Sequence, residues 1–313
     1  MNKIPVIIDC DPGHDDAIAL AVAFASEKLD IRAVTTVGGN QTLDKTTANA
    51  LKVLSFLGVK DVPVAMGAAE PLGGPLKVAA NVHGDSGMDG PQLPDAEITC
   101  SELSAIELME KVITESKEPV TLIPMGPLTN IAGFLVSCPH LAKKISRISL
   151  MGGGAMFGAW TPSAEFNVWQ DPEAAFIVFS SGIPITMHGI DNTRRAFVTD
   201  EDIEKFRTCG RVGAFAAELM DFFTQYTRAK GLPFGIHDAN AVAWVIDPSI
   251  YETVEGHVEV DLYGSKTRGC TVVDIRSNWA KSLRIGKPVT DIAMGVDRER
   301  FVDLLINSFK KYN

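Results

Sequence analysis

Short apolar runs rich in β-branched residues alternate with longer amphipathic stretches along most of the chain. Six runs are predicted as strands, at residues 4–9, 31–37, 62–66, 120–125, 145–151 and 183–188. Five stretches between them have helical periodicity, at 17–25, 43–57, 101–116, 128–136 and 172–179, with Asp44, Ser101 and Asp171 near their starts. This alternation predicts an α/β fold, an open and mainly parallel central sheet with helices on both faces.

The pattern changes after residue 191. Helical segments at 200–208, 212–227 and 238–246 are followed by β-like runs at 254–263, 271–275 and 291–296 and by a closing helix at 298–311. We expect added helices and a small C-terminal β portion of antiparallel strands. No Pro/Ser-rich linker or charge block divides the chain, which predicts a single domain over residues 1–313. The longest irregular stretch, 67–99, is rich in Gly and Pro and is expected to cover a site.

Composition narrows the class of protein. With 313 residues, 46% hydrophobic and 22% charged, the chain is typical of globular proteins and can fold without a disulfide or metal, so any metal should serve chemistry. A net charge of −10 opposes binding to nucleic acid. The apolar runs are too short to span a membrane, signal-peptide features are absent, and five scattered cysteines suggest free thiols. These features predict a cytoplasmic location, with neither membrane nor nucleic acid as a partner.

An acidic cluster follows the first predicted strand. Asp9, Asp11, Asp15 and Asp16 fall in one short segment, and residues 4–26 contain no Lys or Arg to balance them. Open α/β sheets bind ligands at the carboxyl ends of their strands. Close carboxylates either raise a pKa or recruit a cation, and oxygen ligands favour Ca²⁺ or Mg²⁺. The alternative is that these residues only cap and decorate a helix N-terminus.

A second group of polar residues stands at His237 and Asp238, at the start of the apolar stretch 239–246. Asp238 could complete a metal shell, and His237 could donate a proton. Alone this pair is a weak signal, because Asp is a common helix cap.

Several motifs resemble those of the inosine-uridine preferring nucleoside hydrolases, in the family's order along nearly the whole chain. Residues 9–16 read DCDPGHDD, which is similar to the family's N-terminal DxDPGxDD signature. Further matches are GGNQT at 38–42, NVHG at 81–84, MGPLTN at 125–130, MGG at 151–153, AEFN at 164–167 and HD at 237–238. The resemblance implies a Rossmann-like nucleoside hydrolase fold.

The resemblance also implies an enzyme. It would cleave the N-glycosidic bond of ribonucleosides, of pyrimidine or inosine type, to base and ribose in nucleoside salvage, with Ca²⁺ as cofactor. The implied metal ligands are Asp11, Asp16, the Met125 carbonyl and Asp238. Asp11 is also the implied general base for a metal-activated water, and His237 the general acid of the His-containing subgroup. Attack at the anomeric carbon would pass through an oxocarbenium-like cation without a covalent nucleophile.

The same resemblance implies which residues contact the substrate. Asp15, Asn40 and Asn167 would hold the ribose 2′ and 3′ hydroxyls, Glu165 would reach the 5′ side, and His83 and Met151 would contact substrate. The family also implies a homo-oligomer, either a tetramer or a dimer. Simpler structural roles are open for some motif residues: a left-handed turn for Asn40, packing for Phe166, core for Met151 and a helix surface for His14.

One position departs from the family pattern. Relatives commonly carry Asn six residues before the Glu of the AEFN motif, where it helps to hold the 5′ hydroxyl, and here that residue is Ala159. A lost neutral hydrogen bond costs about 0.5–1.5 kcal/mol, which weakens binding without abolishing chemistry. Tyr226 and Phe234 are candidates for base contacts, and the preferred base stays open.

Two other functions compete with this hypothesis. A phosphatase of the haloacid-dehalogenase kind also begins with Asp-x-Asp after its first strand, and GDSGMD at 84–89 mimics its late acidic motif. That motif, however, lies early and in an irregular stretch. The second alternative is a nucleoside binder without catalysis, which Ala159 suggests and the presence of Asp11 and His237 opposes.

Overall fold

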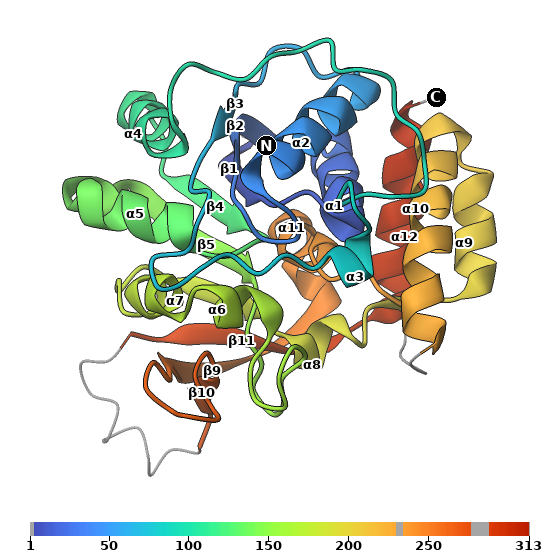
Figure 1. Ribbon diagram of the computed structural model, residues 1–313. Coiled ribbons are helices and arrows are strands. Elements are labelled where there is room, and N and C mark those ends of the chain that lie inside the picture. The colour runs from blue at the N-terminus through green and yellow to red at the C-terminus, as the bar shows by residue number, and fades with distance from the viewer. Residues whose placement is uncertain (1–2, 230–233, 277–287, 313) are drawn as a thin grey trace.

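A nine-stranded sheet crosses the part of the protein that the computed structural model describes, residues 3–229, 234–276 and 288–312 (Figure 1). The strand order is β10-β9-β11-β6-β5-β4-β1-β2-β3. From β3 to β11 neighbouring strands run parallel, so the predicted open, mainly parallel α/β sheet is confirmed. The strands are β1 (Ile4–Cys10), β2 (Leu29–Thr36), β3 (Val64–Met66), β4 (Val120–Pro124), β5 (Ile145–Met151), β6 (Ile185–His188), β9 (Tyr251–Val260), β10 (Thr271–Asp274) and β11 (Thr290–Val296).

The C-terminal β portion continues the central sheet. β9 pairs antiparallel with both β10 and β11, as expected. β11 also pairs parallel with β6, with Thr290 opposite Ile185, so the last strands extend the sheet rather than forming a separate one. A small additional hairpin joins β7 (Phe197–Val198) to β8 (Phe234–Gly235).

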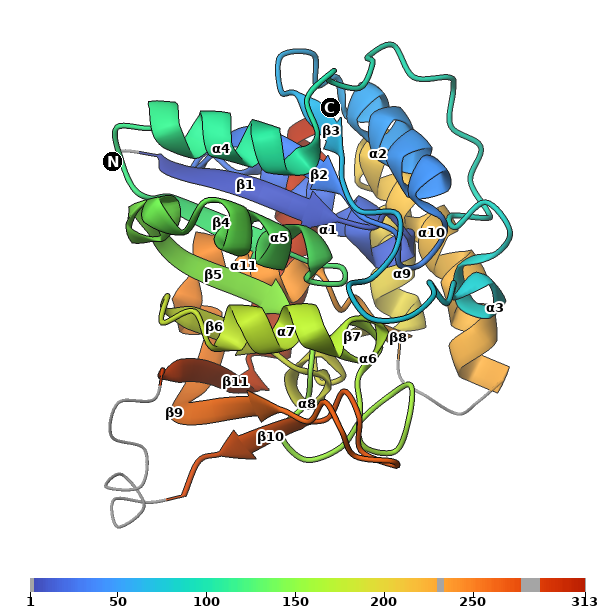
Figure 2. The same ribbon diagram turned by 60° about the vertical axis from the view of Figure 1, so that its left-hand side comes forward.

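Helices cover both faces of the sheet (Figure 2). One face carries α4 (Ala105–Glu115), α5 (Thr129–Ser137) and α7 (Pro172–Phe179). The other carries α1 (His14–Ala25), α2 (Leu43–Leu57), α9 (Asp200–Arg207), α10 (Gly210–Ala229), α11 (Ala239–Ile246) and α12 (Arg298–Phe309). In β1, Ile7 enters the first core while Val6 and Ile8 enter the second, because successive strand residues face opposite sides.

The helix predicted at 101–116 begins later in the structure. α4 begins at Ala105, not near Ser101, because Ser104 and Glu107 form a capping box. The Glu107 N–H donates to Ser104 Oγ at 3.3 Å, and the Ser104 N–H donates to the Glu107 carboxylate at 2.8 Å. Asp171, in contrast, caps α7 as predicted, accepting the Ala174 N–H at 3.0 Å.

Several short helices were not predicted from the sequence, because one or two turns are too short to show a periodicity. They are α3 (Ala80–His83), α6 (Phe166–Gln170), α8 (Ile190–Thr193) and the 3₁₀ turns Pro139–Lys144, Pro248–Ile250 and Lys310–Tyr312. Among the described residues, none of the helices combines the length and the apolar character needed to cross a membrane. All five cysteines are free thiols, as predicted.

His188, at the end of β6, gives the fold a sensitivity to acid. Its ring is fully buried against Tyr251, with centroids 5.1 Å apart, and neither ring nitrogen has a hydrogen-bond partner within the described ranges. Burial lowers its pKa from 6.5 to about 3. Between these two pH values the unfolded chain binds the extra proton, so stability falls as the pH falls, by up to about 1.4 kcal/mol per pH unit.

We therefore expect His188→Leu to lose less thermal stability than the wild type between about pH 6.5 and 4.5. Thermal unfolding followed by circular dichroism across this range measures the difference. His140→Leu is the matched control, because His140 is exposed and its removal should leave the pH dependence unchanged. Parallel curves for wild type and His188→Leu would contradict the assignment.

Candidate active site

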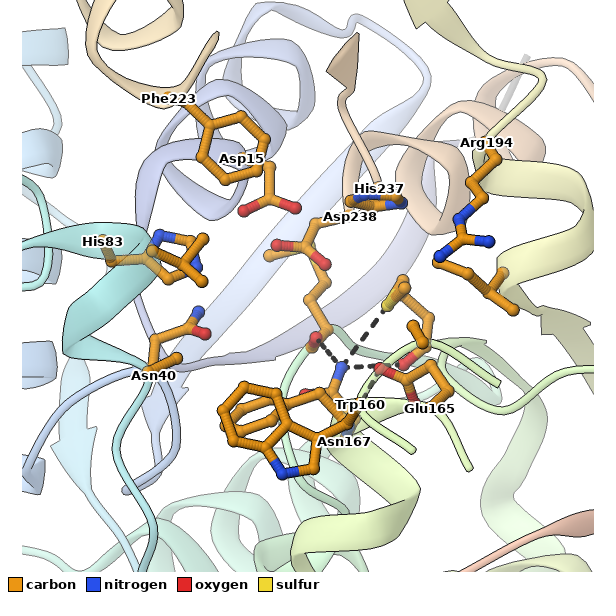
Figure 3. Close-up of a pocket in the computed structure, with 17 residues that line it drawn as sticks. Asp15, Asn40, His83, Trp160, Glu165, Asn167, Arg194, Phe223, His237 and Asp238 are labelled. Carbon is orange, nitrogen blue, oxygen red and sulfur yellow. Dashed lines mark hydrogen bonds between the residues drawn. The ribbon is translucent and has the colours of Figure 1, made fainter. Parts of the chain in front are cut away.

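A pocket lies at the carboxyl ends of β1, β4 and β5 (Figure 3). Of the eleven residues predicted for the site, two, Asp11 and Asp16, are buried beside it. The other nine line its walls: Asp15, Asn40, His83, Met125, Met151, Glu165, Asn167, His237 and Asp238. Residues distant in sequence therefore meet at the edge of the sheet where open α/β proteins bind ligands.

The acidic residues converge from two helices. Asp15, Asp16 and Asp238 each offer a carboxylate oxygen, and these oxygens lie within 4.8 Å of one another. Asp15 and Asp16 occupy the first turn of α1, while Asp238 directly precedes α11. The Asp16 carboxylate is held in place by the N–H groups of Asp11, at 3.1 Å, and Gly13, at 3.0 Å.

Burial raises the pKa of every carboxyl group in this cluster. The pKa of Asp15 rises to about 7, first through burial and then through the charge of Asp16. Burial also raises the pKa values of Asp11 and Asp238 well above their usual range, followed by the charge of Asp16 for Asp11 and the charge of Asp15 for Asp238. No Lys or Arg of the described chain forms an ion pair with these groups. Such a set of oxygen donors suits a hard divalent cation.

Two glycines leave room for Asp11. A Cβ at Gly39 would collide with Asp11 Oδ2, and a Cβ at Gly126 would collide with Oδ1. The GGNQT and MGPLTN motifs thus need glycine because the backbone closes around this carboxylate.

Asn40 is tied to the same carboxylates. Its N–H donates to Asp11 Oδ2 at 2.6 Å, and its Nδ2 donates to Asp16 Oδ2 at 3.3 Å. The left-handed turn considered for Asn40 is wrong, because no non-glycine residue in the described chain has a positive φ.

Asn167 and Glu165 meet at the start of α6. Asn167 Nδ2 donates to the carbonyls of Met125, at 2.7 Å, and Met151, at 3.2 Å, so the amide offers only its Oδ1 to a ligand (Figure 3). Glu165 caps α6 by accepting the N–H groups of Gly153 at 2.9 Å, Asn167 at 2.9 Å and Val168 at 3.2 Å. A carboxylate has about four acceptor positions, so Glu165 can accept one more donor.

His237 stands beside Asp238 and faces into the pocket (Figure 3). Its Nδ1 lies 2.8 Å from Thr193 Oγ1, which fixes the orientation of the ring. Burial, and then the positive charge of Arg194, lower its pKa to about 4, so the ring is neutral at pH 7. A neutral ring offers an N–H to a ligand when Thr193 donates to Nδ1.

His83 reaches the pocket from α3, within the irregular stretch 67–99. Ala79 and Val82 of this stretch also line the pocket, in agreement with the expected cover over a site. His83 Nδ1 lies 3.0 Å from Nδ1 of His14, whose Nε2 lies 2.8 Å from the Asp89 carbonyl.

His14 is therefore not on the helix surface, the simpler role considered for it. It is fully buried and stacks on Phe222, with centroids 5.1 Å apart. Its contact with His83 makes it a supporting residue of the site. Its place inside the acidic signature was the one signal in the sequence for this role.

Other pocket residues were not predicted from the sequence, and the aromatic candidates were predicted at other positions. Phe223 lines the pocket, whereas the side chains of the candidates Tyr226 and Phe234 lie outside the described residues. Phe166 packs on Trp160, with centroids 4.9 Å apart, and both also line the pocket. The remaining unpredicted residues of the wall are Ile190 and Arg194, and Ala159 lies there too.

The acidic motif at 84–89 closes a turn instead of forming a phosphatase site. Asp89 accepts the N–H groups of Asp85 and Ser86, both at 3.0 Å, and this turn does not follow a strand.

An open α/β sheet with buried carboxylates, amides and imidazoles around one pocket at its carboxyl edge defines a hydrolase of the nucleoside hydrolase class. The comparison with protein families agrees: the chain belongs to the inosine-uridine preferring nucleoside hydrolase family, whose model matches residues 6–303. The predictions of this family and of a ribonucleoside-hydrolysing enzyme are confirmed, against both a phosphatase and a non-catalytic binder.

Similar proteins cover the full chain. It is 48% identical over 314 residues to the pyrimidine-specific ribonucleoside hydrolase RihA of Enterobacter sp. (strain 638), with 99% of each chain covered. The RihA of Photobacterium profundum is 49% identical over 315 residues, covering 98% of this chain and 99% of the relative. Among solved structures, the purine-preferring ribonucleoside hydrolase from Gardnerella vaginalis matches with a TM-score of 0.90, 30% identity and 98% coverage of each chain. The plant nucleoside hydrolase PpNRh1 matches with a TM-score of 0.89 and 33% identity, covering 98% of this chain and 99% of its own.

Proposed function

We propose that this enzyme is a Ca²⁺-dependent hydrolase of pyrimidine ribonucleosides that acts in nucleoside salvage. The observation that carries the proposal is the pocket itself, whose walls hold most of the residues that the family resemblance assigns to ribose, base and metal. The pyrimidine preference is supported by relatives near 48% identity that are named pyrimidine-specific, whereas the purine-preferring neighbour is 30% identical.

The residues present fit a hard divalent cation. Asp11, Asp16, Asp238 and the Met125 carbonyl would hold it. The buried carboxylates of Asp16 and Asp238, whose oxygens lie within 4.8 Å of each other without an ion-pair partner in the described chain, support this assignment. When bound, a Ca²⁺ ion would supply Lewis acidity toward the attacking water and the ribose hydroxyls.

The side chains of the enzyme have the remaining catalytic and binding roles. Asp11 takes a proton from the attacking water, while Asp15, Asn40 and Asn167 hold the 2′ and 3′ hydroxyls. Glu165 offers its remaining acceptor position to the 5′ hydroxyl, and Met151 and His83 contact substrate. The buried carboxylates favour the positive charge that develops on the ribosyl group, and His237 donates its N–H to the departing base.

Three further properties belong to this proposal. One continuous sheet, which joins N-terminal and C-terminal strands, supports a single domain over residues 1–313. Free thiols at all five cysteines support a reducing, cytoplasmic location. The family resemblance supports a homo-oligomer, dimer or tetramer, which light scattering after size-exclusion chromatography measures.

Ribose release from uridine, cytidine, inosine and adenosine tests the proposal. We expect the pyrimidine nucleosides to be preferred by at least about tenfold in kcat/KM. Treatment with a chelator should abolish turnover, and Ca²⁺ should restore it. Faster hydrolysis of inosine than of uridine would overturn the pyrimidine preference. Full activity after complete removal of metal would overturn the role of the cation.

A further inference from the structure

Arg194 places an unpaired positive charge on the wall of the pocket. It directly follows α8, is half-buried, and its guanidinium points into the pocket beside His237 (Figure 3). The guanidinium lies over the Phe157 ring, 5.2 Å from its centroid. Within residues 3–229, 234–276 and 288–312 it has no hydrogen-bond or ion-pair partner.

The neighbouring carboxylates are already engaged by the backbone. Asp191, one turn earlier, accepts the N–H groups of Ala155 at 2.5 Å and Met156 at 3.0 Å. Glu165 accepts three backbone N–H groups as the cap of α6. The charge of Arg194 is therefore left for a ligand, opposite the acidic cluster that would face the ribose and the metal.

Two observations place this charge on the base side of the pocket. Thr193, the neighbour of Arg194 in sequence, contacts His237 Nδ1 at 2.8 Å. Figure 3 also shows the Arg194 guanidinium on the same side of the pocket as the His237 ring. The guanidinium therefore lies near His237, the residue that is proposed to face the base.

We propose that Arg194 determines base specificity by binding the O2 carbonyl of the pyrimidine. This inference rests on the proposed function and deepens it. When the C1′–N1 bond breaks, its electron pair goes to N1 and spreads to O2, so a donor at O2 binds the transition state more strongly than the ground state. A guanidinium keeps its charge at every working pH and can supply this donor.

The chemistry of the bases explains why such a contact selects pyrimidines. Uracil and cytosine both carry O2 on the carbon beside the glycosidic nitrogen. Purines carry a C–H group on one side of that nitrogen and a ring-fusion carbon on the other, so they offer no oxygen at this place. A cation at this position therefore favours both pyrimidines over inosine and adenosine.

Arg194→Gln and Arg194→Lys test the proposal in the Ca²⁺-loaded enzyme. We expect Arg194→Gln to lower kcat/KM for uridine and cytidine by about 10–100-fold, mainly through kcat. Arg194→Lys should recover part of the loss, because it restores charge without the planar donor pair. Inosine and 4-nitrophenyl riboside, whose leaving groups have no O2, should change by less than about threefold.

Arg195→Gln is the matched control, because Arg195 lies outside the pocket and its guanidinium donates to the Met294 carbonyl. It should leave the rates on all substrates unchanged, and thermal unfolding should show that the variants are folded. Equal losses of Arg194→Gln on every substrate would overturn the proposal, since Arg194 would then support the site as a whole. So would a wild type that hydrolyses uridine 5′-monophosphate with an Arg194-dependent rate, because the charge would then serve a 5′-phosphate. A wild type inactive on uridine but active on inosine would instead overturn the proposed function, independently of the variants.

Discussion

Asp11→Asn is expected to lower kcat/KM for uridine by about 10²–10⁴-fold, the usual contribution of a general base. Asn has nearly the same shape, so it fits between Gly39 and Gly126, where Asp11 is 1% exposed. It cannot accept a proton from water at neutral pH, and it removes one negative charge from the proposed metal site. Steady-state ribose release and calorimetric Ca²⁺ binding measure the two losses separately.

Asp171→Asn is the control for this variant. Asp171 is also a buried carboxylate, but it accepts the N–H of Leu72, at 2.8 Å, and the hydroxyl of Thr129, at 2.6 Å, outside the pocket. Its substitution should lower the melting temperature and leave kcat nearly unchanged. If Asp11→Asn keeps wild-type activity with Ca²⁺ present, another group must deprotonate the water.

The enzyme should discriminate between uridine and 2′-deoxyuridine by about 10⁴-fold in kcat/KM, because a site built to bind a hydroxyl is left with unpaired buried groups when that hydroxyl is missing. Asp15 and Asn40, the proposed partners of the ribose hydroxyls, are only 7% and 9% exposed, so water compensates poorly. Competing hydrolysis of the two nucleosides, followed by chromatography of the released base, measures this ratio.

The 5′-deoxyribonucleoside is the comparison for this experiment. Glu165 has only one acceptor position left for the 5′ hydroxyl, and Ala159 adds no donor or acceptor, so the loss there should be much smaller. Similar rates for uridine and 2′-deoxyuridine would show that the ribose hydroxyls lie away from Asp15 and Asn40.

The central sheet was predictable because its strands are buried on both faces. That burial produces the continuous apolar runs from β1 to β6, which stand out between amphipathic helices. The parallel partner of β11 was not predictable, since strand pairing across a large sequence separation leaves no local pattern. Ser104 was likewise overlooked in favour of Ser101, because only the position of Glu107 distinguishes the true cap.

The acidic part of the site could be predicted from the sequence because Asp11, Asp15 and Asp16 lie close together along the chain. Glu165 was identified by family resemblance alone, and Asp238 gave only a weak signal from its place before an apolar stretch. The convergence of these two residues depends on how α6 and α11 dock. Arg194 and His14 were not predicted as site residues, because their importance comes from neighbours far along the chain. Arg194 lies beside His237 in the pocket (Figure 3), and His14 contacts His83 and the Asp89 carbonyl. A single side chain beside such partners has no sequence signature.

The packing of α1 has a consequence for synthesis on the ribosome. This helix carries Asp15 and Asp16, and its apolar residues are covered in part by α11 and α12, which are made last. β11 must also enter the sheet between β6 and β9 before the sheet is complete. A nascent chain that ends before residue 238 therefore lacks Asp238 and leaves the part of α1 that α11 and α12 cover exposed to solvent. We therefore expect the enzyme to become competent only after nearly the whole polypeptide has left the ribosome, because exposed apolar surface of incomplete chains favours aggregation before that point.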